Sequence, residues 1–125
     1  MNNYVIQDLI KLVQDFCEAR DWDQFHNPKE LAIGISTEAN ELLDIFRFKS
    51  EEQMQTIMSN PAKREHVGEE LADVLFFILR FIQMNGFDTK EILLDKIRKN
   101  DAKYPVEKAK GHNEKYDEYS FKTIK

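Results

Sequence analysis

Two pairs of acidic residues lie within the most apolar stretches of this 125-residue chain. Glu38 and Glu41 occur in TEANELLDIF, and Glu70 and Asp73 occur in EELADVLFFI. Residues three positions apart are neighbours on a helix, so each pair presents two carboxylates at nearly one point. Burying unpaired carboxylates is costly, and four that converge from two helices repel one another unless a cation lies between them. The pairs therefore predict two helices that face each other across a metal site.

An all-oxygen ligand set favours a hard divalent ion, Mg²⁺ or Mn²⁺, whose coordination is completed by water and substrate phosphates. The alternative places these acids on solvated helix edges in ion pairs, but basic residues three or four positions from Glu38 and Glu41 are nearly absent. A carboxylate-bridged iron bundle normally uses Glu-x-x-His pairs. None of the three histidines falls in either acidic motif, which argues against redox iron.

Helical periodicity accounts for most of the chain, and no useful run alternates with a period of two, so the sequence predicts an all-α fold. The expected helices span about 6–19, 29–48, 51–59, 62–84 and 89–104. We therefore expect an antiparallel four-helix bundle with one short extra helix. Its domain should cover residues 1–105, and residues 106–125 should form a basic tail.

The centre of the expected helix at 62–84 is apolar on every side from Val74 to Leu79. A single small bundle rarely buries a helix so completely. We therefore expect this segment to pack also against a second subunit, giving a homo-oligomer, either a dimer or a tetramer.

The net charge of −5 argues against binding a nucleic acid polymer through a basic surface. A single cysteine, Cys17, excludes an internal disulfide. The longest apolar stretch, LADVLFFILRFI, is too short and too charged to span a bilayer, and the N-terminal residues do not have the pattern of a signal peptide. We expect a cytoplasmic protein without membrane partners.

Two further groups of residues accompany the acidic motifs. Trp22, the sole tryptophan, and His26 lie in a polar turn before the second helix. The tryptophan either stacks on a base or packs in the core, and the histidine either stabilises the turn or contacts a substrate. On the last helix, one face carries Lys96, Asn100, Lys103 and Tyr104. The alternative for this face is a solvated basic stripe, although Asn100 shares its row with apolar residues and should point inward.

Three blocks of the sequence, in this order, resemble the MazG-type all-α nucleotide pyrophosphohydrolases, most closely the branch that is similar to dCTP pyrophosphatases. The blocks are RDWDQFHNPKELAIGISTEANEL, EELADVLFFIL and KIRKNDAKYP. With their spacing they cover roughly residues 9–116. The resemblance implies an enzyme that uses Mg²⁺ to hydrolyse a nucleoside triphosphate, with dCTP or a modified relative as the first candidate, to the monophosphate and pyrophosphate.

The resemblance also implies roles for individual residues. The metal ligands and catalytic acids would be Glu38, Glu41, Glu70 and Asp73, with Glu41 or Glu38 accepting a proton from water. Trp22 and Phe48 would flank the base, Phe77 would line its pocket, and Asn100 would bind the nucleotide near Asp73. His26 is a further candidate contact. The phosphates would be bound by Lys96, Lys103, Tyr104 and, from the tail, Lys115.

Three positions depart from the dCTP-specific members. Phe48 stands where they carry tryptophan, Phe77 replaces a tyrosine, and Val13 replaces a histidine of the animal enzyme. These changes keep an aromatic cage but remove polar groups, so the preference for cytosine stays open. A competing hypothesis is a non-catalytic helical module that binds a nucleotide or a partner protein through the same surface.

Overall fold

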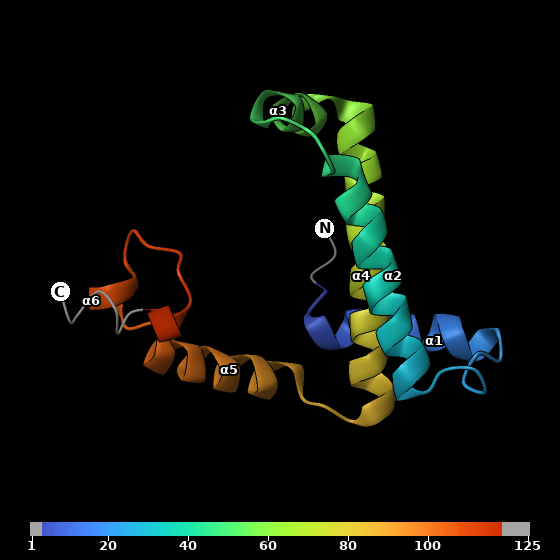
Figure 1. Cartoon of the computed structure of the whole chain (residues 1–125). Coiled ribbons are helices and arrows are strands. Elements are labelled where there is room, and N and C mark those ends of the chain that lie inside the picture. Colours follow the sequence, from blue (N-terminus) through green and yellow to red (C-terminus); the bar gives the residue numbers. More distant parts are fainter. Residues whose placement is uncertain (1–3, 119–125) are drawn as a thin grey trace. The chain divides into compact units, whose positions relative to one another are not determined.

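The computed structural model describes residues 4–118, and every regular element in that range is a helix (Figure 1). The elements are α1 (Ile6–Ala19), α2 (Pro28–Phe46), α3 (Glu51–Ser59), α4 (Pro61–Asn85), α5 (Thr89–Lys103), α6 (Val106–Ala109) and a 3₁₀ turn, η1 (Tyr116–Glu118). The all-α prediction is confirmed. Each expected helix is present with ends within two residues of those predicted, and the segment expected as a tail contains α6 and η1.

Short polar signals set the helix ends. Asn27 and Asn60 each accept a hydrogen bond from a backbone N–H of the first turn, at 2.8 and 3.0 Å, and a proline follows each cap. Ser50 and Gln53 form a reciprocal capping box at the start of α3. Gly86, with φ of 70°, ends α4 in the left-handed conformation that glycine adopts without strain. These local bonds explain why the helix bounds follow from the sequence.

The chain divides into two units, Met1–Phe87 and Asp88–Lys125, and each is described by itself. In the first unit α4 is the central element, and α1, α2 and α3 all pack against it. Its core joins Ile10 of α1 to Leu79 and Ile82 of α4. The second unit contains α5, α6 and η1.

Helices α2 and α4 run side by side in opposite directions (Figure 1). This pairing brings the middle of α2 beside the N-terminal half of α4, where the two acidic motifs lie. Another stripe of α4 stays uncovered in the chain, because Leu71, Leu75 and Ile78 are each at least one third exposed. Among the helices of residues 4–118, none is long and apolar enough to cross a membrane.

Candidate active site

Three glutamates meet between α2 and α4. Carboxylate oxygens of Glu38, Glu41 and Glu70 all lie within 4.8 Å of one another. Asp73 lies one turn further along α4, outside this group, and its charge contributes to raising the pKa of Glu38 and of Glu70. The structure therefore brings the two predicted motifs to one place, with three acids in a tight cluster and the fourth beside it.

The cluster is electrostatically strained without a cation. The Oε2 atoms of Glu38 and Glu70 are buried and have no hydrogen-bond partner among the described residues. Loss of hydration raises the pKa of both carboxyls, and the neighbouring Glu41 raises them further. A buried acceptor without a donor costs free energy, and a divalent cation would satisfy both oxygens while cancelling the repulsion. The carboxylate donor set thus fits a hard metal ion.

Two residues beside the cluster were not identified from the sequence. His66 lies one turn before Glu70, with its Nδ1 at 3.9 Å from Glu70 Oε1. Together with Asp44, it lines a cavity of about 480 Å³ that also contacts Glu41 and Glu70. Their spacing was a usable signal, because Asp44 follows Glu41 by three residues and His66 precedes Glu70 by four. This cavity gives a ligand access to the acids.

An aromatic cavity opens where α1 and the Trp22 loop meet α4. It has a volume of about 500 Å³ and is lined by Leu12, Val13, Phe16, Trp22, Asp73, Phe76 and Phe77. Asp73 is its only acidic lining residue and connects it to the acidic cluster. Trp22 is 36% exposed, and its ring centroid lies 5.7 Å from that of Phe16 in an edge-to-face contact. A flat ring can therefore enter between aromatic walls.

This cavity joins Trp22 and Phe77, both predicted as site residues, and adds Phe16 and Phe76 to them. These two phenylalanines were not identified from the sequence, because helical spacing alone does not distinguish a cavity wall from the core. Val13 also lines the cavity, so the position at which a histidine is expected in the animal enzyme is apolar here. The cavity consequently offers a base wide stacking surfaces and few hydrogen-bond partners.

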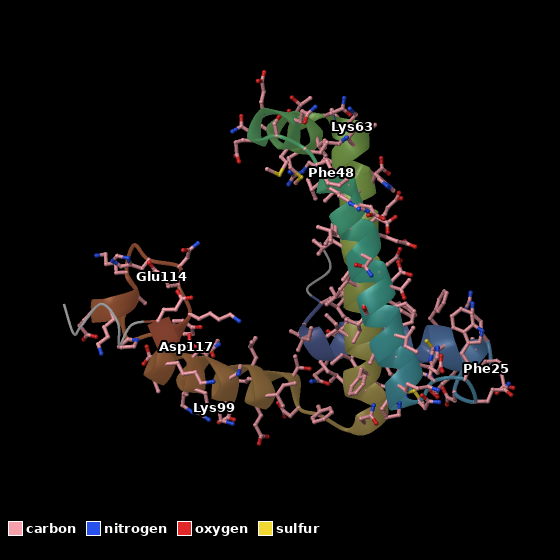
Figure 2. The ribbon with its side chains drawn as sticks, in the orientation of Figure 1. Phe25, Phe48, Lys63, Lys99, Glu114 and Asp117 are labelled. Carbon is pink, nitrogen blue, oxygen red and sulfur yellow. The ribbon has the colours of Figure 1, made fainter. Side chains whose placement is uncertain are left out.

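Phe48 lies at the other end of α2. Helix α2 has 19 residues, which corresponds to a length of about 28 Å, and it separates Phe48 from the loop of Trp22. Figure 2 shows Phe48 near α3 and Phe25, from the Trp22 loop, at the opposite end. Phe48 is 90% exposed and its backbone is in the left-handed region, with φ of 63°. The guanidinium of Arg47 lies over its ring, 4.7 Å from the ring centroid. Within one chain, the structure does not bring Phe48 and Trp22 around one base.

The remaining predicted contacts divide between the two units. His26 lies in the first unit, with its ring centroid 6.0 Å from that of Trp22. The second unit holds Lys96, Asn100 and Lys103 on α5, Tyr104 at its end, and Lys115 just before η1. Asn100 is exposed, as are Leu93 and Ile97 of its row, so the expected inward orientation is not seen in the chain alone. The roles of these second-unit residues stay predictions.

The all-α fold, the acidic cluster between two antiparallel helices and the aromatic cavity beside it define a helical protein with a candidate metal site next to a ligand pocket. Residues 33–119 match the model of the MazG-like family, and the chain belongs to that family. The resemblance seen in the sequence is thereby confirmed.

Several relatives share most of this chain. dCTP pyrophosphatase 1 of Bos taurus is 31% identical over 111 residues, which cover 89% of this chain and 66% of the relative. The Mus musculus protein of the same name is 30% identical over 119 residues, covering 95% and 70%. The chain thus spans about two thirds of the length of these relatives. The crystal structure of a pyrophosphatase from Archaeoglobus fulgidus superimposes with a TM-score of 0.75 at 31% identity, covering 84% of this chain and 96% of that one.

Proposed function

We propose that this protein is a nucleotide pyrophosphohydrolase that converts a nucleoside triphosphate to its monophosphate and pyrophosphate. The observation that carries the proposal is the convergence of the Glu38, Glu41 and Glu70 carboxylates within 4.8 Å, next to an aromatic cavity that shares Asp73 with the acidic centre. A base in the cavity would leave its phosphates beside the acids, because Asp73 lines the cavity and lies one turn from Glu70. The names of the relatives and of the similar solved structure support the same reaction.

The four acids would hold Mg²⁺ or Mn²⁺. Such an ion supplies charge neutralisation for the pyrophosphate leaving group and makes a bound water more acidic. Glu38 and Glu41 come from consecutive turns of α2 and face Glu70 of α4, so the protein fixes the ligands on two packed helices. Either Glu41 or Glu38 accepts the proton of the attacking water, since a general base must lie within hydrogen-bond reach of it.

The aromatic cavity would bind the base. Trp22 and Phe77 stack on it, and Phe16 and Phe76 complete the walls. An apolar pocket discriminates weakly between ligands that differ by a methyl or a hydroxyl group, whereas hydrogen-bonding pockets discriminate strongly. We therefore propose dCTP and pyrimidine triphosphates with an apolar substituent as substrates, with a looser preference than a polar pocket would impose.

We further propose that the active form is a homo-oligomer, a dimer or a tetramer. Two features of the first unit call for a second copy. Leu71, Leu75 and Ile78 form an uncovered apolar stripe on α4 at i, i+4, i+7 spacing. Phe48 is nearly fully exposed at the far end of α2 from Trp22. A second copy would cover the stripe and supply its Phe48 to the base cavity of the first.

The test is pyrophosphate release from dCTP, 5-methyl-dCTP, dTTP, dATP, dGTP and CTP, with Mg²⁺ and with a chelator. We expect release from at least one pyrimidine triphosphate only when Mg²⁺ is present. A Glu70→Gln variant should be inactive, whereas Glu65→Gln, an exposed position five residues earlier on α4, should match the wild type. No release from any triphosphate, together with stabilisation by nucleotide, would favour the binding module instead.

A further inference from the structure

Arg80 is a buried cation with three partners. Its exposed fraction is 0%, and it is the one charged residue in the core of the described chain. Its Nε donates to His26 Nδ1 at 2.9 Å, its Nη1 donates to Gln83 Oε1 at 2.6 Å, and its Nη2 donates to Asp23 Oδ1. A buried charge persists only when such bonds compensate its lost hydration. The geometry of Arg80 is therefore specified by these partners.

Two of the three partners belong to the loop between α1 and α2. Asp23 and His26 lie 57 and 54 residues before Arg80, so these bonds tie the loop to α4. Phe25 of this loop is largely exposed and contributes little packing against α4. Asp21 takes a left-handed conformation with φ of 56°. Two hydrogen bonds from the Arg80 guanidinium therefore fix this loop against α4.

These hydrogen bonds determine the position of Trp22. It directly precedes Asp23, and its ring contacts those of His26 and Phe16. On α4, Arg80 follows Phe77 by three residues and Asp73 by seven, so one face of the helix carries an acid, a wall of the cavity and the attachment point of the loop. A shift of the loop relative to α4 changes the gap between Trp22 and Phe77.

We propose that Arg80 is a positioning residue that holds Trp22 at the width needed to stack on a base, through Asp23 and His26. The inference rests on the proposed function, because it assigns the cavity to the base. It also fixes the state of His26. Since His26 Nδ1 accepts the hydrogen bond from Arg80, the ring is neutral and carries its proton on Nε2. The pKa of His26 is lowered, mainly by burial and secondly by the charge of Arg80, which agrees with a neutral ring.

The experiment uses the full chain and two ways of breaking the attachment. Asp23→Asn removes the counter-charge from a side chain that is half exposed. Arg80→Met keeps a long side chain in the core and leaves no buried charge unpaired, so it stays informative if Asp23→Asn does not fold. The matched control is Asp21→Asn, the same change in the same loop. The Asp21 carboxylate accepts a hydrogen bond from Gln24 and not from Arg80, and asparagine tolerates the positive φ of this position.

Two readouts separate positioning from mere stabilisation. Trp22 is the only tryptophan, so acrylamide quenching of its fluorescence reports its environment alone. We expect Asp23→Asn and Arg80→Met to raise this quenching and to raise KM for the best triphosphate about tenfold, as for a lost base-stacking contact, with kcat nearly unchanged. Circular dichroism should show wild-type helicity, and Asp21→Asn should match the wild type in every measurement.

Folded Arg80→Met with wild-type KM and wild-type quenching would overturn the inference, as would a lowered melting temperature with no change in either readout. If the wild-type protein hydrolyses no triphosphate, the proposed function fails on its own. The fluorescence measurement then still decides whether Arg80 positions Trp22, because it needs no turnover.

Discussion

The ring of Phe77, a wall of the aromatic cavity on α4, lies against the backbone of Gly34 on α2. A Cβ atom added to Gly34 would stand 2.6 Å from Phe77 Cδ1 and 2.7 Å from Cε1. Real Cβ atoms do not come so near a ring, so glycine at this position lets the phenylalanine occupy its place between the helices. The absence of a side chain at Gly34 on α2 thus leaves room for Phe77, a wall of the cavity on α4.

Gly34→Ala should therefore destabilise the protein and weaken substrate binding. Overpacking costs about 1–3 kcal/mol, which outweighs the gain of about 1 kcal/mol in helix propensity. Urea unfolding measures the first effect and KM the second, because the displaced ring narrows the cavity.

The chain offers a matched control for this change. Gly68 is also helical, but a Cβ there has no atom within 4 Å, so Gly68→Ala should stabilise the protein by about 1 kcal/mol. The double variant Gly34→Ala/Phe77→Leu should recover stability, since leucine can vacate the contact. Equal effects of the two glycine substitutions would contradict the packing argument.

Glu41→Gln and Asp73→Asn should each lower kcat by at least about two orders of magnitude. Each amide keeps the shape of the side chain but removes the charge that would bind a divalent cation. Pyrophosphate release measures the loss, and circular dichroism checks that the helices persist. The control is Glu65→Gln, at an exposed position on α4, which should keep wild-type turnover. Near-normal turnover in either acid variant would remove that residue from the catalytic centre.

The helix ends and the acidic centre could be predicted from the sequence because the forces that set them are local or simple. Asn27-Pro28 and Ser50 with Gln53 are caps whose bonds span three residues. The facing of Glu38 and Glu70 follows from helical spacing and from the cost of four converging negative charges. Neither inference needed knowledge of long-range packing.

Other parts of the site could not be predicted, for physical reasons. Phe16 and Phe76 have the same helical periodicity as core residues, and periodicity does not distinguish a filled core from a cavity wall. The sequence shows Arg80 only as a charge that argues against a membrane span. Two of its three partners lie more than fifty residues away, so its burial depends on tertiary structure. Likewise, the left-handed conformation of Phe48 and its exposure have no signal in residue type.

The metal-free protein should become less stable relative to its Glu38→Gln variant as pH rises. The folded-state pKa of Glu38 is raised above the ordinary value of 4.5, so the folded protein keeps this proton to higher pH than the unfolded chain. The stabilising contribution is complete below 4.5 and is lost as pH rises through the folded-state pKa. Urea unfolding of both proteins with a chelator, from pH 4 to pH 8, measures the difference and cancels the titrating groups outside the acidic cluster.

The variant should thus exceed the wild type in stability at neutral pH while lacking activity. Glu65→Gln, outside the cluster, should show no such pH-dependent difference. A stability difference that shrinks with rising pH would contradict the raised pKa of Glu38.

Mg²⁺ should reverse this neutral-pH deficit in the wild type. A ligand that binds only the folded state at a hundred times its dissociation constant adds about 2.7 kcal/mol of stability. Thermal unfolding with MgCl₂, against NaCl of equal ionic strength, isolates binding from screening. The Glu70→Gln variant should gain much less, because it lacks one of the three clustered carboxylates. Equal gains in both proteins would place the ion elsewhere.

Mixing two variants that bind the base weakly should restore activity at low substrate concentration if Phe48 serves the base cavity of a neighbouring copy. In a dimer of one Phe48→Ala chain and one Trp22→Ala chain, one site keeps its own Trp22 and receives Phe48, while the other site lacks both. Random co-refolding makes half of the dimers mixed, so about one quarter of wild-type activity should appear. Trp22→Ala mixed with Glu41→Gln is the control, because Trp22 and Glu41 lie in the same unit of one chain and no site regains both. Activity no greater than the mean of the two parents would assign Phe48 to its own chain, or to no base at all.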